Sequence, residues 1–227
     1  MLGAALAWTL TIPQRVIAGI MAFGSGVLVS ALSFELVDEA WGRAGLAPVV
    51  IGLLGGTLVY SGVNVLLAQK GARDRKRSGD QHSDGNSTAI AVGALLDGVP
   101  ESIVIGVSLL GGHGVSVTTV VAIFLSNLPE GLSSAAGMRK AGRSARYVFG
   151  VWGSIALASG VSAIVGNLLF AGLPAGIVAA TQAAAAGAIL TMLADTMIPE
   201  AFEEAHDFAG LLTVAGFVAS FALSRAG

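Results

Sequence analysis

Long apolar runs, separated by short polar segments, follow one another along almost the whole chain. Seven of them are about 17 to 25 residues long, which lets an α-helix cross the roughly 30 Å hydrocarbon core of a bilayer. The seven runs are Val16–Val37, Val49–Ala68, Thr88–Leu110, Val117–Met138, Tyr147–Phe170, Ala175–Met197 and Phe208–Ser224. The pattern predicts an all-α, polytopic membrane protein with seven full transmembrane helices, in a single domain over residues 1–227.

A shorter apolar stretch, Met1–Thr11, precedes these runs. As a helix it reaches only about 16 Å, roughly half of a bilayer. We therefore expect a partial N-terminal helix, equivalent to the last turns of a first helix whose start is missing from this chain. A signal peptide is disfavoured, because no basic residue precedes the apolar stretch and no small-residue cleavage site follows it.

The one sizeable hydrophilic segment is Gln69–Ser87, which predicts a flexible loop. Its basic residues are Lys70, Arg73, Arg75, Lys76 and Arg77. Because Lys and Arg are retained on the cytoplasmic side, this loop is expected inside the cell. With that orientation every Lys and Arg except Arg43 and Arg225, 10 of the 12 in the chain, lies inside. We expect the protein to reside in the plasma or inner membrane.

The composition supports this class and excludes others. The chain is 54% apolar and only 11% charged, with a mean hydropathy of +0.80, whereas soluble domains carry about 25% charged residues. The 32 glycines indicate close contacts between helices in lipid. The net charge of −2 offers no support for a nucleic-acid partner. The absence of cysteine excludes disulfides, thiolate zinc sites and thiol catalysis.

Two helix ends resemble each other. Glu35–Ala40 closes the predicted second helix and Thr196–Ala201 closes the seventh, each with an apolar pair, one residue and then Glu-Ala. In the orientation above these helices run in opposite directions. The pattern favours an inverted repeat, in which three outer helices at one end of the chain match three at the other, as in many transporters.

Carboxylates inside apolar helices are the informative departures, because each costs about 2.5 to 3.5 kcal/mol at a helix centre on insertion scales. Asp97 and Glu101 lie at i and i+4 in the predicted fourth helix, and Asn127 and Glu130 at i and i+3 in the fifth. Two like charges on one face repel unless a cation or a proton lies between them. Each helix is therefore predicted to present a pair of oxygen ligands at mid-depth.

A proline accompanies each pair. Pro100 and Pro129 donate no backbone hydrogen bond, which releases the carbonyls of Leu96 and Leu125 beside the carboxylates. Carboxylate, amide and carbonyl oxygens together suit a divalent cation. The alternative is a proline kink with a protonated, packed carboxylate. Repetition of the pattern in two adjacent helices disfavours it.

Three further acidic residues are candidates for the path of the ion. Glu35 lies near the outer end of the second helix. It would either bind a metal ion that enters or extend its side chain to the interface between membrane and water. Asp195 and Glu200 mark the cytoplasmic end of the seventh helix, where they would meet a metal that leaves.

At these residues the chain resembles the ZIP family of divalent metal transporters. The segments Asp97–Ser102 and Ser126–Gly131 match the family's two Pro-Glu motifs, and Glu35 falls where the family often has a histidine. The resemblance implies eight helices, a variable cytoplasmic loop after the third, and a metal site between the fourth and fifth. The ligands implied here are Asp97, Glu101, Asn127 and Glu130.

The chain also departs from the family pattern. Asp97 replaces a histidine, Gly98 an asparagine, and Ser126 a histidine or glutamine. Gly153-Ser154 stands about where many members place Glu-Pro, which implies one metal site rather than two. Without imidazole ligands the preference for zinc weakens, so manganese, iron(II) and magnesium join zinc as expected cargo.

The resulting hypothesis is a carrier, not an enzyme, that moves a divalent metal ion across the lipid bilayer by alternating access. The inward direction comes only from the family resemblance. Two alternatives stay open: an intramembrane enzyme that uses the acid pair, and a non-transporting membrane protein derived from a carrier. A homodimer is also left open.

Overall fold

The computed structural model describes the backbone of residues 1–72, 87–108 and 117–226, and these residues are helical almost throughout, with no strand among them. The first half contains α1 (Leu2–Thr9), α2 (Gln14–Ala31), the π-helix η1 (Leu32–Val37), α3 (Asp38–Ala44), α4 (Leu46–Leu67), the π-helix η2 (Ala68–Ala72) and α5 (Ser87–Ser108). The second half contains α6 (Val117–Lys140), α7 (Ala145–Phe170), α8 (Ala175–Met192), the π-helix η4 (Leu193–Met197), α9 (Ile198–Ala205), the 3₁₀-helix η5 (His206–Phe208) and α10 (Ala209–Ala226). The prediction of an all-α fold is confirmed.

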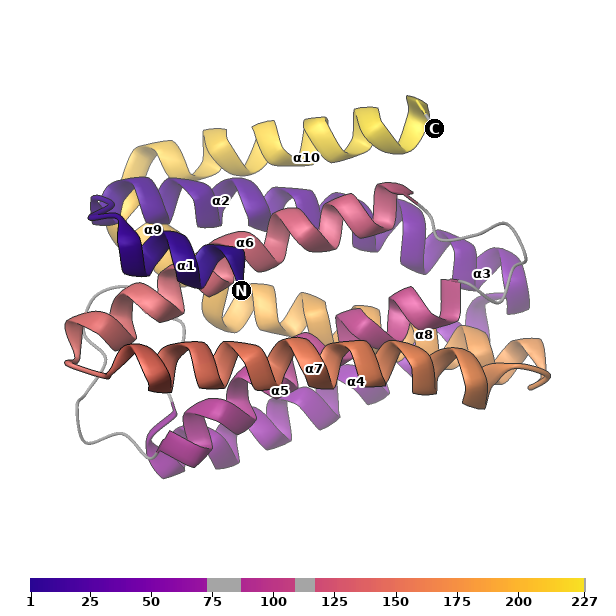
Figure 1. Ribbon diagram of the computed structural model, residues 1–227. Helices are drawn as coiled ribbons and strands as arrows, with labels where there is room; N and C mark the ends of the chain where they lie inside the picture. The colour runs from indigo at the N-terminus through magenta and orange to yellow at the C-terminus, as the bar shows by residue number, and fades with distance from the viewer. Residues whose placement is uncertain (73–86, 109–116, 227) are drawn as a thin grey trace.

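Four stretches of the described residues are long and apolar enough to cross a membrane, which is consistent with a membrane protein. They are Gln14–Ala44, Leu46–Lys70, Ala145–Phe170 and Ala175–Arg225. The last is 51 residues long and is divided at His206, whose φ of 42° lies in the left-handed region. There the chain reverses between α9 and α10 (Figure 1). The predicted number of seven spans goes beyond this finding.

The predicted loop at 69–87 was too long at both ends. Helical structure continues from α4 through η2 to Ala72, and α5 already begins at Ser87. Hydropathy marks where a helix leaves the lipid, and Gln69 and Lys70 can extend the helix into water because both are good helix formers. Residues 73–86, the rest of the predicted flexible loop, lie outside the described residues.

The helices pack mainly in pairs: α2 with α10, α4 with α8, α5 with α7, and α1 with α6. Figure 1 shows α10 beside α2 at one edge of the bundle, with α4 and α5 toward the opposite edge. The outer surfaces of α4, α7 and α10 are apolar and exposed. Their most exposed residues are Ile51, Leu58, Leu157, Leu168 and Leu211. Such faces suit contact with lipid chains.

Backbone contact without intervening side chains joins α2 to α10. A Cβ at Gly26 would lie 1.8 Å from the carbonyl oxygen of Thr213, and one at Gly216 would lie 2.0 Å from that of Phe23. No real side chain fits such spaces. Glycine is therefore required at both positions for this approach.

The same arrangement joins α4 to α8. A Cβ at Gly187 would lie 2.2 Å from the carbonyl oxygen of Leu53, and one at Gly56 would lie 1.9 Å from that of Ala184. The same spacing holds in both pairs. On α2 and on α8, the residue three positions before the glycine supplies the carbonyl that contacts the glycine of the partner helix. The two helix pairs thus share one contact pattern.

Two of the π-helices, η1 and η4, occur at matching positions in these two pairs. η1 begins at Leu32, six residues after Gly26, and η4 begins at Leu193, six residues after Gly187. The two segments with similar sequences, Glu35–Ala40 and Thr196–Ala201, therefore both overlap a π-helix. π-helical turns are rare and occur mostly at functional sites.

η1 and η4 each carry an acidic residue that hydrogen-bonds to the partner helix. Ser224 of α10 donates to Glu35 of η1, and Asn64 of α4 donates to Asp195 of η4 at 3.5 Å. These bonds join η1, which continues α2, to α10, and η4, which continues α8, to α4.

Candidate metal site

The centre of the candidate site is a direct contact between α5 and α6. Asn127 of α6 donates a hydrogen bond from Nδ2 to the Glu101 carboxylate of α5 and another, of 2.9 Å, to the carbonyl oxygen of Ile123. Both donors of the amide nitrogen are thereby engaged. The Oδ1 atom of Asn127 is an acceptor and remains suitable for a cation.

The two glutamates of the site are buried. Glu101 is 2% exposed and Glu130 is 4% exposed, while Asn127 is partly buried. Glu130 follows Asn127 by one turn of α6 and so lies on the same side of that helix. Both carboxylates therefore face the protein interior. Buried carboxylates require compensation by a hydrogen bond, a proton or a cation.

Asp97 is the remaining predicted ligand, and its side chain lies outside the described residues. The backbone of Asp97 belongs to α5, one turn before Glu101. Among the described side chains, no group of three or more His, Asp or Glu comes together. The inclusion of Asp97 in the ligand set therefore stays a prediction.

The helices continue through both prolines. Pro100 lies inside α5 and Pro129 inside α6. One turn of α5 near the proline is supported by Ser102, whose Oγ donates to the carbonyl oxygen of Gly98 at 2.7 Å. The Ser102 hydroxyl and the Asn127 amide thus both bind the carbonyl four residues earlier in their own helix, and neither acceptor is one of the carbonyls that the prolines release, Leu96 and Leu125.

Gly131, directly after Glu130, allows two other helices to approach the site. A Cβ at Gly131 would lie 3.6 Å from Cα of Gly3 on α1 and 3.7 Å from Cη2 of Trp152 on α7. Although α1 is short, it therefore covers the turn that carries Glu130. The close packing of α1 and α7 thus explains why the Pro-Glu-Gly motif ends in a residue without a side chain.

The helix α7 supplies neighbours of the site that sequence reasoning missed. Trp152 lies against Gly131, while Ile155 and Ser159 lie next to Gly98, where a Cβ would be 3.6 and 3.4 Å from their side chains. The spacing of these three residues places them on one face of α7. This helical spacing was the sequence signal from which these neighbours of the site could have been found.

Gly153 stands where the family resemblance places a ligand. A Cβ added at this position would meet no atom within 4 Å among the described residues, so Gly153 faces open space rather than the site. The expectation of one metal site rather than two stays a prediction.

Glu200 is brought next to the site by α9. It is 6% exposed, and Ser133 of α6 donates to its Oε1 atom at 3.3 Å. Ser133 follows Glu130 by three residues, so Asn127, Glu130 and Ser133 form one polar stripe along α6. This stripe connects the candidate site with Glu200, one of the residues predicted on the way out.

The other two predicted path residues face different helices. The hydrogen bond of Asp195 with Asn64 directs it toward α4, and that of Glu35 with Ser224 directs it toward α10. Asp195 is exposed and Glu35 is partly buried. Their roles in the path of an ion stay predictions.

No protein-family model and no curated protein matches this chain.

Proposed function

We propose that this protein is a divalent metal cation transporter, similar in plan to the ZIP family, with its substrate site between α5 and α6. The observation that carries the proposal is the hydrogen bond of Asn127 to the buried carboxylate of Glu101, with Glu130 buried one turn away. Acidic residues at such depth are retained where they act on ions or protons.

The proposed ligands are Glu101, Glu130, the Oδ1 atom of Asn127, and Asp97. All are oxygen donors, which favour manganese, magnesium and iron(II) and give zinc less advantage than imidazole would. When the metal binds, Glu101 ligates the cation through a carboxylate oxygen. The amide then either keeps its donor on the carboxylate or turns its oxygen to the metal.

The proposed way out of the site follows the polar stripe of α6. From Glu130 an ion passes Ser133 and reaches Glu200, which already accepts a hydrogen bond from Ser133. Glu35 is proposed on the opposite, outer side, with the basic segments of the chain in the cytoplasm. Asp195 is proposed at the cytoplasmic end.

We further propose that seven full spans and the partial α1 form an inverted repeat. The shared glycine contacts of α2 with α10 and of α4 with α8, the matched π-helices and the two acid bonds support this arrangement. The repeat relates α2 to α8 and α4 to α10. Transporters with such repeats alternate access by moving one helix group against another around a fixed site.

In this proposal the two glycine-joined pairs move as units. Backbone-to-backbone contact leaves no side-chain layer between α2 and α10 or between α4 and α8, so each pair stays together. α5 and α6 carry the ligands, with α1 and α7 packed on them. Access alternates when this second group shifts against the pairs.

The test is metal uptake into proteoliposomes by the intact chain and by Glu101→Gln, Glu130→Gln and Asp207→Asn. The first two variants keep the shape of the side chain and remove its charge. Asp207 is exposed and lies in η5, away from the stripe, so its variant controls for the loss of one negative charge. We expect uptake to fall at least tenfold for the two glutamate variants only. Equal uptake by all four proteins would refute the proposal.

A further inference from the structure

A pocket of about 380 Å³ lies where α1 ends, α2 begins and α6 ends. Its walls are largely apolar and include Leu10, Ile12, Ile17 and Ala136. Arg139 and Lys140 are the cationic members of the lining, and no acidic residue is among the described residues that line it. The pocket therefore combines a hydrocarbon-like wall with two positive charges.

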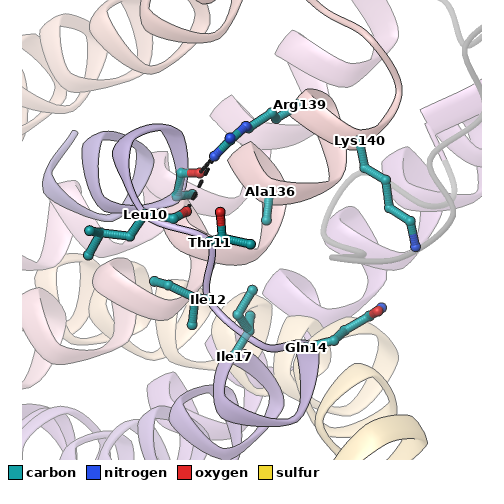
Figure 2. A pocket seen from close by; sticks show the side chains of 9 residues that line it. Leu10, Thr11, Ile12, Gln14, Ile17, Ala136, Arg139 and Lys140 are labelled. Atoms are coloured by element: carbon teal, nitrogen blue, oxygen red, sulfur yellow. Dashed lines mark hydrogen bonds between the residues drawn. The ribbon is translucent and has the colours of Figure 1, made fainter.

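Arg139 is held in place and keeps part of its binding capacity. Its Nη1 atom donates to the carbonyl oxygens of Ala7, Trp8 and Leu10 at 3.0, 2.9 and 3.3 Å, which ties the end of α1 to α6 (Figure 2). A guanidinium has five N–H donors, and none of these bonds uses Nε or Nη2. These remaining donors suit an anionic oxygen group such as phosphate.

Lys140 and Gln14 extend toward another side of the same pocket. Figure 2 shows Lys140 reaching from α6 and Gln14 from the start of α2, with Ala136 between Arg139 and Lys140 and with Ile12 and Ile17 on a further side of the pocket. A ligand in the pocket thus meets a cation or a polar amide at its edges and apolar side chains elsewhere.

Aromatic and basic residues around the pocket indicate its depth in the membrane. The Arg139 guanidinium lies 5.9 Å from the Trp8 ring, which also packs edge-on against Phe149 at 6.2 Å. Nearby in sequence, Arg143 lies 5.3 Å from the Tyr147 ring. Tryptophan, tyrosine and basic residues gather at the level of the lipid headgroups, and the charge distribution places this end on the cytoplasmic side.

We propose that the pocket binds one anionic phospholipid, with the phosphate at Arg139, Lys140 as a second positive charge at another edge of the pocket, and an acyl chain along Leu10, Ile12 and Ile17. Charge complementarity selects an anionic headgroup, and the apolar wall selects a lipid over a free phosphate ion. Cytoplasmic leaflets are rich in such lipids, and basic pockets between helices bind them. This inference goes beyond metal transport and does not depend on it.

The test measures the melting temperature of the purified chain in a mild nonionic detergent during titration with short-chain lipids. Phosphatidylglycerol is compared with phosphatidylcholine of the same chains and with inorganic phosphate. A ligand that binds only the folded state raises the melting temperature by mass action, by about 5 to 10 °C at a hundredfold excess over Kd. We expect this shift with phosphatidylglycerol, and less than a quarter of it with the other two additives.

Three variants locate the effect. Lys140→Gln removes one charge of the pocket, and Ala136→Leu fills its apolar part without a change of charge. Lys70→Gln removes a basic charge in η2, outside the pocket lining. We expect the first two variants to reduce the shift in melting temperature to half or less of the unmodified value. The third variant should leave the shift unchanged. Equal shifts in all variants, equal shifts with both lipids, or a full shift with phosphate alone would each overturn the proposal.

Discussion

Asn127 on α6 donates a hydrogen bond to the buried carboxylate of Glu101 on α5, and this bond is a polar link between the helices that contain Pro100 and Pro129. It has a consequence for stability as well as for the proposed transport. A buried charge that loses its donor remains desolvated, so removal of the donor is expected to destabilise the metal-free protein.

Asn127→Ala is therefore expected to lower the free energy of unfolding by about 2 kcal/mol in the absence of metal, since hydrogen bonds to charged groups contribute about 1.5 to 3 kcal/mol. Asn167→Ala is the matched control. Asn167 joins α7 to α5 through a neutral bond of 3.3 Å to the carbonyl oxygen of Gly106, for which about 1 kcal/mol is expected. Equilibrium unfolding in detergent compares the two, and an equal or smaller loss for Asn127→Ala would contradict the assignment.

The glycine contacts predict a strong sensitivity to one methyl group. Gly26→Ala and Gly187→Ala place a Cβ within 1.8 and 2.2 Å of a backbone carbonyl oxygen, so the helix pairs must separate. We expect each to destabilise the protein by at least about 2 kcal/mol, in the range of overpacked cores. Gly160→Ala is the control, because its added Cβ meets no atom within 4 Å among the described residues. It is expected to be neutral or slightly stabilising, as helix propensity favours alanine.

The position of Glu200 predicts a split between binding and transport. Glu200→Gln removes a charge next to Ser133 but leaves Glu101 and Glu130 intact, so metal affinity measured by titration calorimetry is expected to change less than threefold. Uptake into proteoliposomes is expected to fall several-fold, because release toward the cytoplasm is slowed. Ser133→Ala should produce a smaller decrease of the same kind. A parallel loss of affinity and uptake would instead place Glu200 among the ligands.

Arg139 is expected to stabilise the attachment of α1. Arg139→Met removes hydrogen bonds to three carbonyls at the end of that helix and should lower the free energy of unfolding by about 1 to 2 kcal/mol. Arg15→Met serves as the control, because Arg15 is exposed and a substitution of this kind changes stability by at most about 0.5 kcal/mol. Hydrogen exchange of the α1 amides should increase only in Arg139→Met. Unchanged protection would contradict this role.

The helices were predictable because hydropathy alone marks them: Val117–Met138 and Tyr147–Phe170 coincide within two residues with α6 and α7. The burial of Glu101 and Glu130 was also predictable, since a carboxylate in an apolar helix has to face the protein. The loop after α4 was predicted with wrong ends because an apolar run ends before its helix does.

The partners of these residues were not predictable, because they depend on the rotation of one helix against another. Sequence spacing shows that Asn127 and Glu130 share a face, but not that the amide meets Glu101. The proximity of Trp152 to Gly131 and of Ser133 to Glu200 likewise comes only from the packing of α7 and α9 on α6. The similar segments around Glu35 and Thr196 hinted at related helices, whereas the shared π-helices carried no sequence signal that we recognised.

The π-helix η4 decides which way α9 presents its side chains. A π turn holds one residue more than an α turn, so everything after it is rotated by about 100° relative to an uninterrupted α-helix. Glu200 meets Ser133 only in this rotated position. Deletion of Ala194 would remove the additional residue, straighten the helix and swing the carboxylate away from α6. The proposed path from the site to the cytoplasm thus depends on a single inserted residue that has no ligand chemistry of its own.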